Sequence, residues 1–359
     1  MQSLGKNRQY SEKAKAIRIL IVVLSLIFSL SCTYSNEVEP RENSKFETKY
    51  YQCEDGKVKV FSSELQKAYE IQLKEIGSIA ISSTTQLAFL NALNFGDKVK
   101  AVPYEKFICD TSILRRLDQG SIYVCGTIEG ISVEHMIANG IDTWFLESFE
   151  QLQHPKAKKA AAAGIQLIPF MDWKESHPLA RAQWLVFTGK LLNRETQADS
   201  IFSQIQKDYL AQIDTIKKST GPIVFAGASF RDNWYLPGGR SYIAQLIADA
   251  GGRYLFASDS NVASFEYSAE LAYDAMQKAD LWVASSNAKS IDELLKSDSR
   301  FDSLTCILNQ SVFVNNKQLC PQGGNTYYSV GVLDPARILN DFRLIFEGKE
   351  GMHYFNKLN

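Results

Sequence analysis

Aromatic, hydroxyl and charged side chains follow the ends of several predicted strands, where they could line a ligand cleft. In open α/β sheets, ligands bind beyond the carboxyl ends of the strands. Aromatic rings there can contact a flat or apolar ligand, and the guanidinium of Arg231 can pair with an anionic one. The alternatives are core packing for each aromatic residue and a surface ion pair for Arg231. The candidate cleft residues are Ser82, Ser83, Tyr104, Glu147, Ser148, Trp173, Phe230, Arg231, Trp234, Phe265, Tyr267, Tyr327 and Tyr328.

Catalytic and metal-binding motifs are absent from the sequence. No two of the 4 His residues lie three or four positions apart, so there is no local two-His metal motif. The HExxH, GxSxG, GxGxxG and GxxxxGKS/T motifs are also missing. These absences argue against several large classes of enzyme without excluding an enzyme, and we expect no cofactor. The small number of His residues also argues against bare zinc or manganese as the ligand.

Composition narrows the class of protein further. The chain has 359 residues, long enough for two lobes of roughly 100–150 residues each. Its 39 basic and 40 acidic residues give a net charge of −1, so the whole chain has no electrostatic preference for nucleic acid. An aromatic content of 11% argues against a largely disordered protein.

Two acidic residues occupy matching positions in two similar stretches of sequence. Glu134 follows Ser132 at the start of a predicted helix, and Glu270 follows Ser268 at the start of another. Each helix precedes a strand that carries Asp and Trp, which suggests two lobes of similar build. A Glu in the first helical turn complements the helix dipole, which is the simple explanation for either residue alone. That explanation does not account for matched positions in both lobes.

The elements that must position these residues alternate between strands and helices. Such alternation predicts an α/β fold with mostly parallel sheets. No strand pattern occurs between residues 178 and 218, where a helix over 194–217 would reach about 36 Å. From this pattern we expect a hairpin at 46–62, an N-terminal α/β lobe at 48–177, a linking helix at 178–218 and a C-terminal α/β lobe at 219–359.

The N-terminus has the pattern of an export signal over residues 1–31. Basic residues precede an apolar run at 19–30, which spans roughly 18 Å and is too short to cross a bilayer. Cys32 follows a small residue at the end of this run, as in a bacterial lipoprotein box, although Ser29 stands where Leu is usual. We expect lipidation of Cys32, with residues 32–47 as a tether. The alternative is an ordinary signal peptide with a chance cysteine.

Export permits disulfides among the remaining cysteines. Cys53, Cys109, Cys125, Cys306 and Cys320 make an odd number, so at least one of them is free or pairs with another molecule. Cys306 and Cys320 flank a predicted strand and could form a bridge. Buried, unpaired cysteines are an equally good interpretation.

The order and spacing of several motifs resemble substrate-binding proteins of metal-chelate ABC importers, which deliver iron–siderophores, haem or cobalamin. The resemblance covers about residues 74–348 and includes IGSIAISSTTQLAFLNALNFGDKVKAVPY, SVEHMIANGIDTWFLES and NWYLPGGRSYIAQLIADAGGRY. It implies two Rossmann-like α/β lobes joined by one long rigid helix, with the ligand between them. It further implies that Glu134 and Glu270 meet Arg residues of an ABC permease. The protein would be a monomer on the periplasmic side of a bacterial membrane.

The sequence leaves the ligand and two rival functions open. Anionic siderophores usually need several Arg residues, and Arg231 is the one good candidate. An aromatic, weakly charged cleft favours cobalamin, while Tyr104, Tyr267, Tyr327 and Tyr328 keep haem open because a Tyr can bind its iron. An exported enzyme on the same fold would need a catalytic set that we do not find. A lipoprotein that scavenges ligand without a permease is the other alternative.

Overall fold

The computed structural model describes residues 46, 48–54, 57–62, 64–214, 221–230, 233–295 and 299–359. The residues from Phe46 to Asn359 form one compact unit. The predicted signal peptide, Cys32 and nearly all of the predicted tether lie outside the described residues. Within the described ranges, no helix has the length and apolar character needed to span a membrane.

The N-terminal lobe is built on a parallel five-stranded sheet of order β6-β5-β4-β7-β8. Strands β4 and β7 at its centre are buried along their whole length, as expected of a parallel sheet covered on both faces. The strands are β4 (Ile79–Ala80), β5 (Val99–Val102), β6 (Tyr123–Val124), β7 (Thr143–Leu146) and β8 (Gln166–Pro169). The accompanying helices are α2 (Thr84–Ala92), α3 (Thr111–Asp118), α4 (Val133–Ala138) and α5 (Pro155–Ala162), with 3₁₀ turns η1 (Gly96–Lys98), η2 (Glu105–Phe107), η3 (Glu150–Gln153) and η4 (Asp172–Lys174).

A separate antiparallel sheet precedes this lobe. The predicted hairpin is confirmed as strands β1 and β2, and a third strand that the sequence did not predict pairs with β2. Tyr51 packs its ring against Trp184 and Phe187, so the sheet lies on the helical region that follows the lobe. The strands are β1 (Tyr51–Glu54), β2 (Lys57–Ser62) and β3 (Lys67–Ile71).

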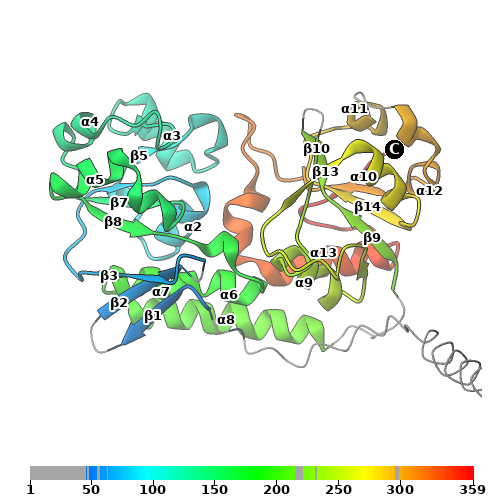
Figure 1. Cartoon of the computed structure of the whole chain (residues 1–359), viewed down its shortest axis with the longest axis horizontal. Coiled ribbons are helices and arrows are strands. Elements are labelled where there is room, and N and C mark those ends of the chain that lie inside the picture. Colours follow the sequence, from blue (N-terminus) through cyan, green and yellow to red (C-terminus); the bar gives the residue numbers. More distant parts are fainter. Residues whose placement is uncertain are drawn as a thin grey trace, which may run out of the picture. The chain divides into compact units, whose positions relative to one another are not determined.

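The linking region, predicted as helical over 178–218, is not one continuous helix. It is divided into α6 (Pro178–Ala182), α7 (Trp184–Leu191) and α8 (Glu195–Ile213). The chain turns between α7 and α8 at Asn193, whose φ of 54° lies in the left-handed region that no helix continues through. The 19 residues of α8 span about 28 Å. This helix packs against α7 at one end and against α13 of the C-terminal lobe at the other (Figure 1).

The C-terminal lobe contains two sheets. A five-stranded sheet of order β12-β9-β14-β15-β16 is parallel except at β16, and a three-stranded antiparallel sheet of order β10-β11-β13 covers one side. The strands are β9 (Ile223–Ala226), β10 (Ala228–Phe230), β11 (Asn233–Leu236), β12 (Arg253–Tyr254), β13 (Phe265–Ser268), β14 (Leu281–Ala284), β15 (Val312–Val314) and β16 (Asn356–Lys357). The helices are α9 (Tyr242–Asp249), α10 (Ala269–Met276), α11 (Ile291–Leu295), α12 (Thr305–Leu308) and α13 (Pro335–Phe346), with the 3₁₀ turn η5 (Ser299–Ser303). The predicted mixed α/β fold with parallel central sheets is confirmed.

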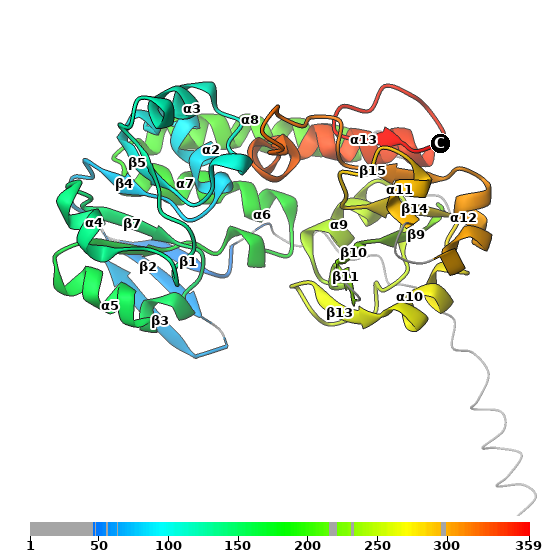
Figure 2. The same cartoon turned by 90° about the horizontal axis from the view of Figure 1, so that it is seen from above.

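Residues 315–333, here named the crossing segment, leave the C-terminal lobe after β15 and reach the N-terminal lobe (Figure 2). The segment contains the 3₁₀ turns η6 (Thr326–Tyr328) and η7 (Val330–Leu333), and η7 packs on α2. A disulfide joins Cys320 of this segment to Cys109 of the N-terminal lobe. The bridge between Cys306 and Cys320 that the sequence left open is therefore wrong, and Cys306 is a free, buried thiol.

Candidate functional site

A pocket of about 410 Å³ lies at the carboxyl edge of the N-terminal sheet. Its walls come from residues that directly follow β4, β7 and β8 and from helix α6. This is the edge at which ligands bind in open α/β sheets. The lining residues are Ser83, Thr85, Gln86, Glu147, Ser148, Gln151, Phe170, Asp172, Trp173 and Arg181.

The first wall of the pocket is the N-terminus of α2. The Ser83 hydroxyl caps the helix by accepting from the Gln86 backbone N–H, and the Gln86 side chain accepts in return from the Ser83 N–H. Gln86 Nε2 also donates to the Leu146 carbonyl at 3.0 Å, which ties the helix start to the end of β7. This reciprocal capping box satisfies backbone groups at the helix start and holds the hydroxyl of Ser83 at the pocket.

Glu147 and Trp173 form the second wall. The indole Nε1 of Trp173 donates to the Glu147 carbonyl at 2.8 Å, while 40% of the Trp173 side-chain surface stays exposed. Lys174 Nζ lies 5.3 Å from the centroid of the indole ring. Burial raises the pKa of the Glu147 carboxyl. The pocket therefore presents a fixed aromatic face next to an acid that is open to solvent.

The third wall links the pocket to the C-terminal lobe. Arg181 Nε donates to Asp172 Oδ2 at 2.9 Å, and its guanidinium carbon lies 4.5 Å from the centroid of the Tyr242 ring. Tyr242 is the first residue of α9 in the other lobe. One side chain thus contacts both a pocket acid and an aromatic ring across the two lobes.

Hydrogen bonding and stacking are the chemistry that this pocket can supply. Hydroxyl, amide and carboxyl groups surround the exposed Trp173 ring, and the guanidinium of Arg181 is paired with Asp172. In the described ranges, no group of three or more His, Cys, Asp and Glu side chains could hold a metal ion.

A match to a known protein family identifies the class of protein to which this chain belongs. A family model described as "Periplasmic binding protein" matches residues 79–319. The chain belongs to the periplasmic binding protein family.

Solved periplasmic binding proteins share the fold. A periplasmic heme binding protein from Pseudomonas aeruginosa superposes with a TM-score of 0.60 at 14% identity, covering 79% of this chain and 98% of that one. The triscatecholate siderophore binding protein from Bacillus subtilis, in complex with ferri-bacillibactin, gives a TM-score of 0.57 at 16% identity and covers 81% and 98%. Identities this low establish a common fold alone.

Curated relatives of this binding protein come from Methanocaldococcus jannaschii. An uncharacterized lipoprotein is 22% identical over 209 residues, which make up 56% of this chain. A second uncharacterized lipoprotein is 21% identical over 257 residues, or 67% of this chain. The chain spans 48% of the length of the first and 63% of the second.

Four candidate cleft residues of this periplasmic binding protein lie in the pocket, namely Ser83, Glu147, Ser148 and Trp173. Phe170, which directly follows β8, lies there too. Sequence reasoning missed the remaining lining residues, which are Thr85, Gln86, Gln151, Asp172 and Arg181. A usable sequence signal existed for Gln86, which lies three residues after the capping Ser83. In a capping box the Gln side chain turns back to the helix start, which here is a wall of the pocket.

Three candidate cleft residues have other roles. Trp234 is 5% exposed and stacks on Phe301 in the C-terminal core, because the antiparallel β11 turns its ring inward. Tyr327 is 6% exposed and packs against Phe355. Ser82 lies next to the pocket, but its hydroxyl donates to the Phe145 carbonyl. Core packing is the observed state of Trp234, and a cleft role for Tyr327 stays a prediction, because buried residues such as Phe170 also line the pocket.

The other candidate cleft residues lie outside the pocket lining. Tyr104 is exposed and makes an edge contact with Phe107. Phe265 and Tyr267 pack together on the edge of the C-terminal core. Tyr328 is the last residue of η6 in the crossing segment. Arg231 and the side chain of Phe230 lie outside the described part of the chain.

Both predicted docking acids occupy exposed first turns of helices. Glu134 lies in α4, which Ser132 caps, and Glu270 lies in α10, which Ser268 caps. Glu134 pairs with Lys159 of α5, and hydrogen bonding from Lys159 lowers the pKa of Glu134. The matched helix starts are confirmed, while the docking role stays a prediction.

Proposed function

We propose that the protein captures a metal chelate between its lobes and delivers it to an ABC permease. The observation that carries this proposal is the pocket at the carboxyl edge of the N-terminal sheet, with the exposed Trp173 ring beside Glu147. Membership of the periplasmic binding protein family supports a role in binding. In this proposal the protein is an exported monomer, held on the periplasmic side of a bacterial membrane by lipid on Cys32.

The chelate in this proposal is cobalamin, an iron–siderophore or haem. Trp173 offers a flat face for stacking, and Ser83, Ser148 and Gln151 offer neutral hydrogen-bonding groups. Since the guanidinium of Arg181 is already paired with Asp172, the described pocket residues favour a large and nearly neutral ligand. Fold neighbours that bind haem and a ferric triscatecholate support the wider class.

Titration with three chelates tests the proposal. Hemin, cyanocobalamin and a ferric triscatecholate would be added separately while tryptophan fluorescence is followed. We expect one of them to quench fluorescence saturably. Trp173→Ala should weaken its binding at least tenfold, because a buried aromatic contact is worth about 1.5–3 kcal/mol. Trp173→Phe, which keeps a ring, should weaken it less.

The matched control is Tyr235→Ala, which removes an aromatic side chain that is 42% exposed and lies outside the pocket lining. Its affinity should equal that of the wild type. Saturable binding that is unchanged in Trp173→Ala would move the ligand site elsewhere. Absence of binding by all three chelates would contradict the proposed ligand class.

A further inference from the structure

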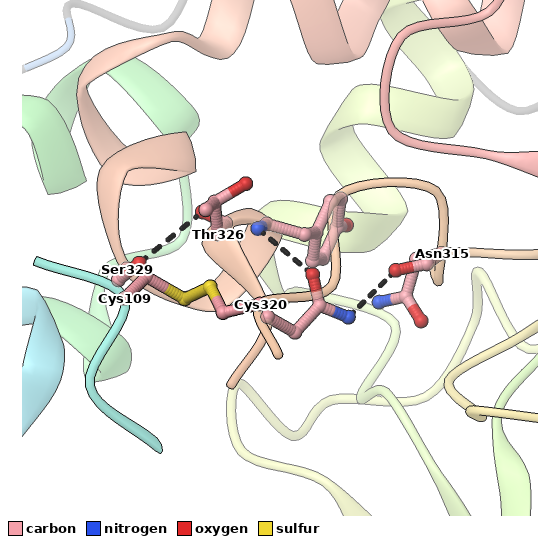
Figure 3. The surroundings of a disulfide bond; sticks show 7 residues. Cys109, Asn315, Cys320, Thr326 and Ser329 are labelled. Atoms are coloured by element: carbon pink, nitrogen blue, oxygen red, sulfur yellow. Dashed lines mark hydrogen bonds between the residues drawn. A yellow bond between two sulfur atoms is a disulfide. The ribbon is translucent and has the colours of Figure 1, made fainter. Parts of the chain in front are cut away.

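The crossing segment is fixed covalently to the N-terminal lobe. Cys109 and Cys320 form a disulfide between positions 211 residues apart in sequence (Figure 3). Gly324 packs tightly beside the bridge, since a Cβ there would lie 2.7 Å from the Phe107 carbonyl oxygen. The lobes are therefore joined by this bridge as well as by the helical linking region.

Two non-covalent attachments follow the disulfide along the segment. The Thr85 hydroxyl donates to the Tyr328 carbonyl at 3.1 Å. Val332 is 5% exposed and belongs to the hydrophobic core of the N-terminal lobe, although the chain reaches it from the other lobe. The segment thus lies along the N-terminus of α2, which is itself a wall of the pocket.

The same segment also contacts the C-terminal lobe, since the Tyr327 ring packs against Tyr354. Within the segment, Asn315 directly follows β15 and donates from Nδ2 to the Tyr328 hydroxyl at 2.7 Å. Asn325 Nδ2 donates to the Asn315 carbonyl at 2.7 Å (Figure 3). The backbone of Tyr328 is therefore bonded to α2 of the N-terminal lobe and its hydroxyl to the residue after β15, with 43% of its surface exposed.

Two walls of the pocket face this segment. Thr85 of α2 bonds to Tyr328, and helix α6, which carries Arg181, packs against η7. Resting on the proposed function, we infer that the crossing segment is a further wall of the chelate site, with Tyr328 at its exposed rim. Cys109 and Cys320 are then positioning residues that fix this wall before the ligand arrives. A wall ordered in advance loses less conformational entropy on binding, so its release should act mainly on ligand dissociation.

The test compares disulfide-free and disulfide-intact proteins in a Cys53→Ser background, which removes the exposed free thiol. The disulfide-free variant carries Cys109→Ser and Cys320→Ser. Thr85→Val is a second variant that keeps the disulfide and removes only the hydroxyl that bonds to Tyr328. Amide hydrogen exchange over residues 320–333 reports the order of the wall. Stopped-flow fluorescence with hemin, cyanocobalamin and ferric triscatecholate reports ligand dissociation, measured well below the melting temperature.

We expect exchange over 320–333 to accelerate at least tenfold in the disulfide-free variant, while exchange in β7 stays unchanged. Dissociation of the bound chelate should accelerate about tenfold, with little change in its association rate. Thr85→Val should accelerate dissociation about threefold. A purely structural disulfide would lower the melting temperature without this kinetic effect.

Unchanged exchange over 320–333 would overturn the inference, because the disulfide would then not order the segment. Accelerated exchange with unchanged dissociation would also overturn it, because the segment would then not belong to the site. If the intact protein binds none of the three chelates, the proposed function fails separately, and Tyr328 loses its role as a rim for that ligand class.

Discussion

Arg181 is ion-paired to Asp172 through a contact of 2.9 Å between Nε and Oδ2. Side-chain exposures of 13% and 5% leave both groups largely out of water. Removal of one partner from such a pair strands the other as a buried charge, which is far more destabilising than loss of a surface pair. The contact therefore makes the pocket wall sensitive to changes at either residue.

Arg181→Met should lower the free energy of unfolding by about 3–5 kcal/mol, because Asp172 stays buried without its counter-ion. The double variant Arg181→Met with Asp172→Leu should recover most of this loss. Urea denaturation would measure the free energy of unfolding of the single and of the double variant.

The matched control for this pair is Arg337→Met. Arg337 is ion-paired to Asp334 at the same distance of 2.9 Å, but 53% of its side chain is exposed. Its removal should change stability by about 1 kcal/mol or less. Equal losses in Arg181→Met and Arg337→Met would contradict the view that burial makes the difference.

Glu175 and His177 should give opposite dependences of stability on pH. Burial raises the pKa of Glu175 to about 7, although Thr48 and Trp184 donate hydrogen bonds to it. Its contribution to stability is present below pH 4.5 and is lost as pH rises through 7, by about 3 kcal/mol. Burial lowers the pKa of His177 to about 4, so its contribution is present above pH 6.5 and is lost as pH falls through 4.

These two effects should nearly cancel between pH 4.5 and 6.5 in the wild type. Glu175→Gln keeps an oxygen that accepts from Trp184, so its stability should rise with pH over this range. His177→Asn keeps an acceptor for the Leu179 N–H, the bond that His177 Nδ1 accepts at 3.0 Å, and its stability should fall instead. Denaturant midpoints at five pH values would test this. Parallel profiles for the two variants would be inconsistent with opposite titrations.

Glu134 and Glu270 should act on the permease and leave the ligand unaffected. Both are exposed at helix starts, so Glu134→Ala with Glu270→Ala should change stability by about 0.5 kcal/mol or less. Chelate affinity should stay the same. Removal of one charge from an ion pair at a protein interface weakens the binding free energy by about 2–5 kcal/mol. The double variant should therefore bind the permease poorly, and stimulation of the transporter ATPase in vesicles should fall to background.

The control for docking is Glu75→Ala with Glu350→Ala, two exposed acids elsewhere on the surface. This pair should stimulate the ATPase normally. Weaker chelate binding with normal stimulation in the Glu134 and Glu270 variant would place those acids in the ligand site.

Cys32→Ser should move the protein from the membrane fraction to the soluble fraction. Lipidation needs the thiol of Cys32, and the apolar run at 19–30 is too short to cross a bilayer. Fractionation with immunodetection measures the change. The same membrane-bound share in Cys32→Ser as in the wild type would refute the lipid anchor.

Local sequence patterns predicted the alternation of strands and helices in both lobes and part of the pocket. A short apolar run followed by polar residues marks the end of a buried parallel strand, which is how Ser83, Glu147 and Trp173 were found. The same pattern misplaced Trp234, because an aromatic residue near a strand end has the same local signature whether it faces a ligand or a core. The antiparallel sheet that buries Trp234 depends on pairing with β13, far along the chain.

Contacts between distant segments had no local signal. Arg181 lies in a region with helical spacing, and only the packing of α6 against α9 and η4 brings it to Asp172 and Tyr242. The pairing of Cys109 with Cys320 depends on the path of the crossing segment between the lobes. An odd number of cysteines could show that one was unpaired, but it could not show which two meet.

Native mass spectrometry of protein purified from its host tests the central claim most directly, combined with an absorption spectrum. The account predicts that the wild type carries one ligand whose mass and spectrum are those of a corrin, a haem or a ferric chelate, and that Trp173→Ala purified in parallel is largely empty. A wild type without such a ligand, or equal occupancy in Trp173→Ala, would contradict capture of a chelate in this pocket.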